Sequence, residues 1–286
     1  MYMKNLFFSA ILLLFSVMSL SSQTIKVEKS YRLFDTNQKG FHPVFNAAGD
    51  LLAFSTDNYD GLNVYDFSNQ SIVKVSDESG SGFQPFFSED NKIFYKNTVY
   101  KSKLKYDGLK SFDLRKKTVK EELTPQRNLK PVRKYGNKTT SPLVWSDGKN
   151  LNIDRNGETE ILNPIENANG YVWASLSPNG QMILFNAVAV GAFVSDLKGN
   201  IISSLGYLNA PVWYDNEFVV GMQDKDDGNN VTESKVIMKN LAGNIVKQLS
   251  DSGQIAMYPT VSSVAKKVAY NTIEGNIYVL ELKIKE

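Results

Sequence analysis

The chain has 286 residues, no cysteine and one histidine, and its 32 Lys and Arg nearly balance its 30 Asp and Glu. The absence of cysteine excludes disulfides, thiolate metal sites and a cysteine-linked lipid anchor. A single histidine argues against histidine-based catalytic triads and zinc sites. Without cysteine the chain must be stabilised by its core alone.

Residues 1–22 predict a secretory signal peptide. Lys4 supplies a positive charge, Leu6 to Leu20 is apolar apart from serines, and small residues stand just before Gln23. A transmembrane anchor, the alternative, needs about 18 to 20 apolar residues, and this run is shorter. We expect cleavage before Gln23, a periplasmic or secreted location, and no integral membrane segment after cleavage.

A unit of about 44 residues recurs through residues 23–286. Clear copies begin at His42-Pro43 and Gln84-Pro85, and each passes from a short strand through a polar turn into further strands. A period of this length with four short strands is typical of a propeller blade. The sequence predicts one all-β domain, a six-bladed β-propeller with four-stranded antiparallel blades. Seven blades are the alternative.

The units follow one another along the chain with different regularity. The second carries a long charged hairpin between Tyr95 and Asp113, the third is the least regular, and the fourth has the clearest turn at Ser177-Pro178-Asn179-Gly180. Their approximate limits are 41–82, 83–123, 124–170, 171–210, 211–249 and 257–283.

The last unit ends one strand short, and the segment Ile25 to Phe34 has no partner of its own. Its end, Leu33-Phe34-Asp35, matches the unit ends Val75-Ser76-Asp77 and Leu249-Ser250-Asp251. Pairing this N-terminal strand with the last blade would close the ring and remove two exposed sheet edges. An open solenoid is the alternative.

Several units share a Phe-x-Pro opening and a turn such as Ser88-Glu89-Asp90-Asn91. An aliphatic–aromatic strand and an Asp-Leu-x-Gly-like hairpin follow. This pattern resembles the WD40-like repeats of TolB-type propellers and covers nearly all of residues 23–286. The resemblance implies a six-bladed ring in an exported bacterial protein. TolB also carries an α/β domain before its propeller, which this sequence does not show, so the partners of TolB are not carried over.

Catalytic signals are weak. The only histidine, His42, precedes Pro43 at the start of a unit, where it could make a structural hydrogen bond or contribute to a ligand site. No G-x-S-x-G motif occurs, and Asp residues fall at turns, where backbone bonding favours them. An enzyme with a carboxylate- or metal-based site in the central channel, such as a polysaccharide hydrolase or lyase, is the alternative to a non-catalytic protein.

One acidic segment resembles a cation-binding loop. Asp224, Asp226 and Asp227 gather oxygen ligands around Gly228, as Ca²⁺ prefers. The spacing differs by one residue from that of a calcium loop, and Glu233 arrives too early to complete it. The alternative is a solvated hairpin tip without a cofactor.

Positive charge is concentrated in residues 92–138, which hold 15 basic and 4 acidic residues with aromatic residues among them. Such a patch could attract an acidic polysaccharide, lipid headgroups or an acidic protein surface. Alternatively, the lysines protect exposed strand edges from pairing. The candidate ligand-binding residues are Lys101, Lys103, Lys105, Arg115, Lys116 and Lys117.

These features together predict an exported, non-catalytic β-propeller that binds a protein or a glycan at the bacterial cell envelope. We expect a monomer and no nucleic-acid partner, because nucleic acid is out of place outside the cytoplasm. The central channel discriminates between the hypotheses. Convergent carboxylates around a metal would favour the enzyme, and a shallow aromatic and basic surface would favour the binding protein.

Overall fold

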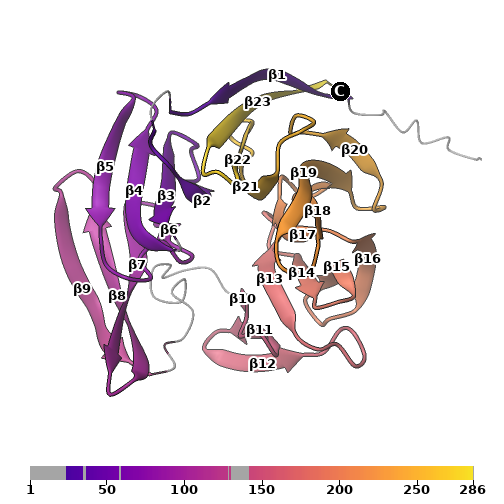
Figure 1. Ribbon diagram of the computed structural model, residues 1–286. Helices are drawn as coiled ribbons and strands as arrows, with labels where there is room; N and C mark the ends of the chain where they lie inside the picture. Colours follow the sequence, from indigo (N-terminus) through magenta and orange to yellow (C-terminus); the bar gives the residue numbers. More distant parts are fainter. Residues whose placement is uncertain (1–23, 35–36, 58, 128, 130–141, 286) are drawn as a thin grey trace, which may run out of the picture.

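Six antiparallel sheets surround a central axis in the computed structural model (Figure 1). It describes residues 24–285 except 35–36, 58, 128 and 130–141. The predicted signal peptide lies outside this part. The described residues form strands and turns, and none of them belongs to a helix that could cross a membrane. The predicted all-β, six-bladed propeller is confirmed.

Strands are numbered along the chain, and each blade orders its strands from the axis outward. The innermost strands are β2 (Phe41–Phe45), β6 (Phe86–Phe87), β13 (Tyr171–Leu176), β17 (Asn209–Trp213) and β21 (Ala256–Ser262). The second strands are β3 (Leu51–Asp57), β7 (Lys92–Lys101), β10 (Leu143–Ser146), β14 (Met182–Ala187), β18 (Phe218–Asp226) and β22 (Lys267–Thr272).

The third strands are β4 (Asp60–Asp66), β8 (Leu104–Asp113), β11 (Leu151–Arg155), β15 (Gly191–Asp196), β19 (Val231–Asn240) and β23 (Ile277–Lys285). The outermost strands are β5 (Ser71–Ser76), β9 (Thr118–Gln126), β12 (Glu158–Leu162), β16 (Ile201–Gly206), β20 (Ile245–Gln248) and β1 (Thr24–Arg32).

Blade three has three described strands, and the other blades have four. Val144 of β10, Leu151 of β11 and Leu162 of β12 pack together against Ile183 of blade four. The second, third and outermost strands of blade one pack against blade two in the same way. We therefore assign β10, β11 and β12 to these three positions.

The N-terminal strand completes the last blade, as predicted. β1 pairs antiparallel with β23 from Thr24 opposite Lys285 to Arg32 opposite Tyr278. The N–H of Leu33 then donates to the carbonyl of Ile277 at 2.8 Å. The first and last described strands therefore lie in one sheet, and the ring is closed.

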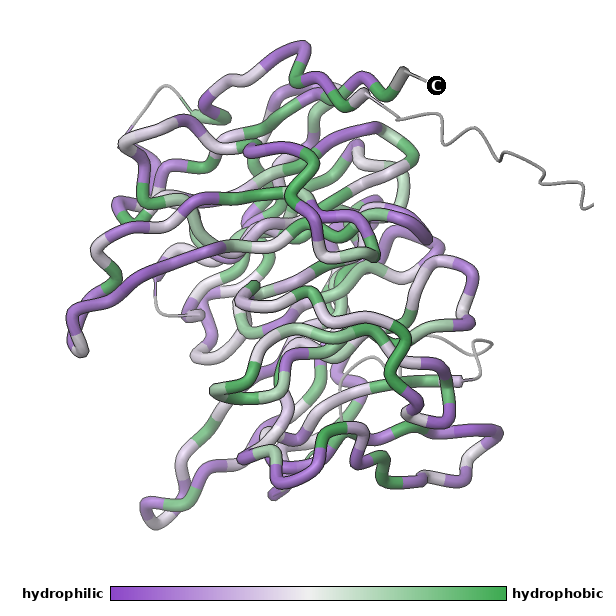
Figure 2. The backbone as a smooth tube through the Cα atoms, turned by 90° about the vertical axis from the view of Figure 1, so that its right-hand side faces the viewer, coloured by the Kyte–Doolittle hydropathy of each residue, from purple (hydrophilic) through white to green (hydrophobic). Residues whose placement is uncertain are grey.

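The hydrophobic core lies between neighbouring blades. Ala53, Leu62 and Val64 of blade one pack against Ile93 and Tyr95 of blade two, and all five are buried. The second strands are buried on both faces, because successive side chains point to opposite neighbouring blades. Leu52 and Phe54 pack against blade six, and Ala53 packs against blade two. In Figure 2 hydrophilic residues, in purple, mark much of the projecting hairpins.

The two sides of the ring carry different connections. We call the side on which the innermost strands begin the mouth face, and the opposite side the rear face. The turns between second and third strands lie on the mouth face, together with the connections from one blade to the next. The turns between first and second strands, and between third and outermost strands, lie on the rear face.

Candidate functional site: the mouth face of the propeller

A backbone distortion recurs close to the mouth in four of the described innermost strands and two residues before the fifth, β6. Four of the five strands shift their pairing register with the second strand at this point. A bulge of this kind turns the side chain at the distortion away from its regular direction. The residues at this position have φ between 43° and 53°: His42, Gln84, Trp173, Ala210 and Tyr258.

Non-glycine residues seldom adopt a left-handed backbone, and doing so costs energy. Four of the five residues precede a proline, which cannot donate a hydrogen bond to the sheet and therefore suits a distorted strand. The repeated Phe-x-Pro opening of the sequence thus has a structural role. In the five blades whose innermost strand is described, this position places a different side chain at the mouth.

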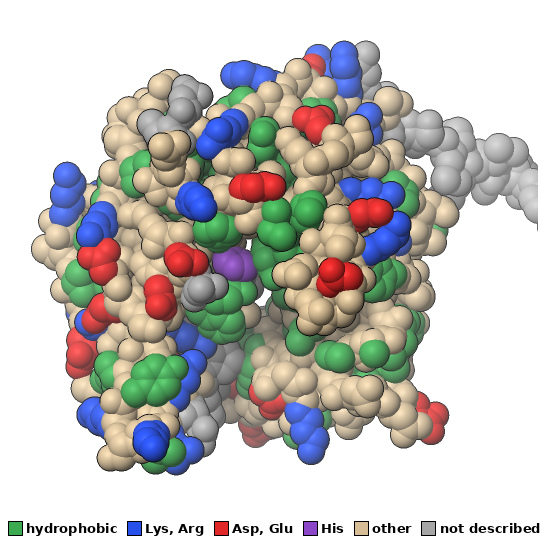
Figure 3. Space-filling view, in the orientation of Figure 1, with side chains coloured by type: hydrophobic (Ala, Val, Ile, Leu, Met, Phe, Trp, Pro, Cys, Tyr) green, Lys and Arg blue, Asp and Glu red, His purple; other side chains and the backbone are tan. Residues whose placement is uncertain are grey.

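Aromatic rings from three blades join in a continuous cluster at the mouth. The ring of His42 stacks on Tyr59 at 4.0 Å and contacts Tyr258 at 4.2 Å between centroids. Tyr59 in turn meets Phe83 edge to face at 5.1 Å. We call these four residues the aromatic arc. In Figure 3 the histidine, drawn in purple, lies beside the central opening with hydrophobic side chains around it.

His42 combines the two roles that its sequence position suggested. Its backbone N–H donates to Oδ1 of Asn271 in the preceding blade at 3.0 Å, a structural bond. Its ring lies in the arc, where burial lowers the pKa of the imidazole from 6.5 to about 4. The imidazole is therefore neutral at pH 7, and the arc presents uncharged rings.

Groups of opposite charge stand at the two ends of the arc. The ammonium of Lys96 lies 4.8 Å from the ring centre of Phe83, and burial lowers the pKa of this lysine. At the other end, burial and then the charge of Asp224 raise the pKa of Tyr258. Oδ1 of Asp224 accepts a 2.9 Å hydrogen bond from Asn209. The arc thus leads from a cation in blade two to a carboxylate in blade five.

The wall of the channel lacks charge where it is described. None of the five described innermost strands contains Asp, Glu, Lys or Arg. Within the described residues, no three His, Asp or Glu side chains stand close enough together to hold a metal ion. The described channel wall therefore offers an uncharged, partly aromatic surface rather than an acid–base pair.

The structure separates the six predicted basic residues into two groups. Lys101, Lys103 and Lys105 lie at the tip of the β7–β8 hairpin on the mouth face. Arg115, Lys116 and Lys117 lie in the β8–β9 turn on the rear face. The ten residues of β8 stand between the groups and span roughly 30 Å at about 3.4 Å per residue. Each group of three therefore shares one hairpin turn, and the two turns lie on opposite sides of the ring.

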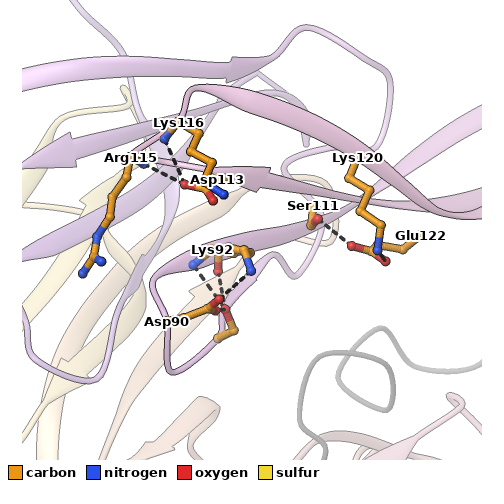
Figure 4. A network of polar contacts seen from close by, with 9 residues as sticks. Asp90, Lys92, Ser111, Asp113, Arg115, Lys116, Lys120 and Glu122 are labelled. Atoms are coloured by element: carbon orange, nitrogen blue, oxygen red, sulfur yellow. Dashed lines mark hydrogen bonds and ion pairs between the residues drawn. The ribbon is translucent and has the colours of Figure 1, made fainter.

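The turn that carries the rear group is held by backbone hydrogen bonds, and ion pairs lie near it (Figure 4). Oδ1 of Asp113 accepts from the backbone N–H groups of Lys116 and Arg115, both at 3.0 Å, and these bonds hold the pKa of Asp113 below its usual range. Nearby, Lys92 pairs with Asp90 at 2.5 Å. The bonds to Asp113 use backbone N–H groups of the turn, and the nearby ion pair belongs to Lys92.

The predicted cation loop is the turn of the β18–β19 hairpin. Asp224 bonds to Asn209, as described above, while Oδ1 of Asp226 accepts from the N–H of Gly228 at 2.9 Å. Oδ1 of Asp227 accepts from the N–H groups of Asn229 and Asn230 at 2.9 and 2.8 Å. The three carboxylates thus hold different partners. Calcium binding here stays a prediction.

Sequence reasoning did not find Tyr59, Tyr258 or Trp173. Tyr59 and Tyr258 are almost 200 residues apart in the chain, and ring closure brings both to His42. A usable signal was present for Tyr258, because it stands before Pro259 as His42 stands before Pro43. An alignment of the residues that precede each proline would have identified four of the five mouth residues with positive φ.

No family model matches the sequence, and no curated protein matches it. Solved propellers match the fold. A protein named as TolB from Agrobacterium tumefaciens superposes with a TM-score of 0.56 at 13% identity, covering 92% of this chain and 98% of that one. The Swd1 propeller domain of Myceliophteria thermophila gives 0.54 at 10% identity, covering 90% and 99%.

The tricorn protease also matches, with a TM-score of 0.51 at 12% identity. That match covers 87% of this chain and only 26% of the protease. The chain therefore has the TolB-type, WD40-like propeller fold that its repeats predicted. At these identities the similarity concerns the fold alone.

Proposed function

We propose that this protein is an exported, non-catalytic binding module of the bacterial cell envelope, which captures a segment of a partner protein on its mouth face. The observation that carries the proposal is the aromatic arc, whose neutral rings lie at the channel mouth between Lys96 and Asp224. Signal-peptide features in residues 1–22 support export to the periplasm or beyond.

Binding fits this surface better than catalysis. Aromatic side chains that are part exposed and already ordered by stacking lose little conformational freedom when a ligand covers them, and they are enriched at binding hot spots. The described innermost strands supply no carboxylate for acid–base work. The enzyme alternative would need groups that the described channel wall does not provide.

A protein partner fits the charges better than an acidic glycan does. The mouth carries a lysine-rich hairpin on blade two and an aspartate-rich hairpin on blade five, so a polyanion would be attracted on one side and repelled on the other. A protein segment can present both signs of charge together with apolar side chains for the arc. We infer that a monomeric ring binds such a segment across its mouth.

The test uses residues 23–286, immobilised, with a solubilised bacterial envelope extract. We expect capture of defined proteins by the unaltered chain and at least tenfold less capture by the double variant Tyr59→Ala/Tyr258→Ala. Val264→Ala, a substitution at an exposed rear-face residue, is the matched control and should capture normally. Circular dichroism and melting curves establish that each variant is folded.

Pretreatment of the extract identifies the class of partner. Protease treatment should abolish capture, and glycosidase treatment should leave it unchanged. The reverse result would assign the mouth to a glycan. Equal capture by the double variant and the unaltered chain would overturn the mouth face as the binding surface.

A further inference from the structure

Among the residues that the structure describes, the tip of the β7–β8 hairpin projects beyond its neighbours. Its outermost backbone pairings with other parts of the described chain are at Thr98, whose N–H donates to the carbonyl of Ser79 at 2.8 Å, and at Asp107, which pairs with Gln126 of β9. Residues 99–106 continue as a two-stranded ribbon. At about 3.4 Å per residue, four residue pairs extend roughly 10 to 14 Å beyond these contacts.

This tip exposes apolar and basic side chains together. Tyr100 is 68% exposed and Leu104 is 41% exposed, and all three lysines of the tip are exposed as well. Tyr100 lies opposite Lys105, and Lys101 lies opposite Leu104. Because cross-strand partners point to the same side, each face of the ribbon carries one large hydrophobic side chain and one lysine.

The turn of the ribbon carries a charged residue where a turn-stabilising residue would fit. Ser102 and Lys103 have φ of 48° and 64°, and two-residue turns with both values positive favour Asn and Gly. Here the apex instead carries a lysine, which makes no ion pair with any described residue. Residues 96–107 contain four lysines and one aspartate, a net charge of +3.

We propose that the β7–β8 tip inserts into the headgroup region of an anionic phospholipid bilayer and holds the mouth face beside the membrane. Lysines bind anionic lipid, while tyrosine and leucine enter the interface, which peripheral elements penetrate by about 5 to 10 Å. A flat protein surface would touch one face of the ribbon only, and a soluble polyanion offers no apolar phase. A headgroup layer surrounds the tip and contacts both faces.

The acidic hairpin sets the orientation. Blade five lies across the ring from blade two (Figure 1), and residues 222–233 carry four carboxylates and one lysine, a net charge of −3. An anionic membrane attracts one side of the mouth face and repels the other. The ring therefore tilts, with blade two inserted and blade five in water. This inference is independent of the partner protein proposed above.

Vesicle co-sedimentation with residues 23–286 tests the proposal. Binding to vesicles of phosphatidylcholine with about 30% phosphatidylglycerol should exceed binding to phosphatidylcholine alone and should weaken with salt. Each lysine near an anionic membrane raises the membrane-binding constant about fivefold. Loss of three lysines in the variant Lys101→Glu/Lys103→Glu/Lys105→Glu should therefore lower vesicle binding at least about 100-fold. Tyr100→Ser/Leu104→Ser keeps the charges and should lose binding several-fold.

The rear-face group supplies a control with the same change of net charge. Arg115→Glu/Lys116→Glu/Lys117→Glu should retain vesicle binding within about threefold. Equal losses in the two charge variants would mean that net charge alone drives association and would overturn the proposal. Failure of the unaltered protein to bind the anionic vesicles would do the same.

Because the chain has no cysteine, single labels can be placed cleanly. An environment-sensitive fluorophore on Ser102→Cys should shift to shorter wavelength when anionic vesicles are added, and the same label on Asn229→Cys at the acidic tip should not. Shifts at both positions, or at neither, would overturn the insertion and the tilt. Binding to a soluble acidic polysaccharide as strong as that to vesicles would reassign the tip to glycans.

Discussion

The hairpins of blade two and blade five occupy equivalent positions and have similar lengths, yet their tips are chemically opposite. β7 and β8 have ten residues each, and β18 and β19 have nine and ten. The first tip carries lysines with exposed Tyr100 and Leu104. The second carries aspartates, asparagines and Gly228, with every carboxylate of Asp224, Asp226 and Asp227 bonded to nearby N–H groups.

This difference separates a stabilised turn from an exposed one. The blade-five tip satisfies its backbone with local side chains, as Asp and Asn do in turns. The blade-two tip places Ser102 and Lys103 in left-handed conformations without such bonds and leaves large apolar side chains in water. A tip that gives up local stability in this way is a better candidate for contact with another surface.

The largest loss of stability is expected on opening the ring that holds both hairpins. Deleting residues 24–34 removes β1 from the last blade and Phe34 from its contact with Phe54, which lies 5.1 Å away. Losing a large buried aromatic residue and a whole strand should cost several kcal/mol, so the ring should open. Thermal melting followed by circular dichroism measures this loss, and equal melting temperatures would contradict ring closure.

A second effect concerns His42, which links the two sides of the mouth. Its folded-state pKa of about 4 lies below the ordinary 6.5. Between these values the unfolded chain binds a proton that the folded chain does not. Stability is therefore complete above pH 6.5 and falls as the pH drops toward 4, by roughly 2 kcal/mol after allowance for solvent screening.

The variant His42→Gln tests this origin of the pH dependence. Blade two already uses Gln84 at the equivalent position, with the same φ of 51°. Denaturant melts of this variant at pH 4.5 and 7.5 should show a smaller difference in the free energy of unfolding than those of the parent. An unchanged difference would place the titrating group elsewhere.

Asp227 offers a direct comparison of the two tips. Asp227→Ala removes the acceptor for the N–H groups of Asn229 and Asn230 and should lower the free energy of unfolding more than the change at the other tip does. Lys105→Ala at the other tip removes only an exposed pair with Asp107 at 3.4 Å and should cost less than about 0.5 kcal/mol. Urea unfolding measures both, and a larger loss from Lys105→Ala would reverse the comparison.

The smallest expected change in stability is a gain rather than a loss. Ser102→Asn/Lys103→Gly gives the blade-two turn the residues that its positive φ values favour, and it should stabilise the protein by about 0.5 kcal/mol. The same change should weaken binding to anionic vesicles, because it removes the apex charge. A variant that gains stability without losing vesicle binding would show that Lys103 has no role at the membrane.

The fold could be read from the sequence because its signals are local and repeated. Prolines, polar turns and alternating strands recur in each unit, and the matching ends at Leu33 and Leu249 indicated ring closure. The grouping of the six basic residues was not predictable by proximity in sequence. Lys105 and Arg115 are ten residues apart along nearly the full length of β8, so they lie on opposite faces. Counting strand residues would have separated them.

The contacts among the aromatic residues of the mouth face could not be predicted, for a different reason. Which residues meet at a ring axis depends on the order of blades and on the bulge in each innermost strand, and neither is visible in one repeat. Tyr59 belongs to a turn of blade one and Phe83 to the connection into blade two. Their contact follows from closure of the ring and not from any local motif.

Photo-crosslinking from the mouth tests the central claim most directly. A benzophenone side chain at Gln84, which is exposed beside the aromatic arc, should form a discrete adduct with an envelope protein. The same group at Val264, exposed on the rear face, should form none. Adducts from Gln84 alone are the predicted result. Adducts from Val264 alone, or equal adducts from both positions, would contradict a binding surface on the mouth face.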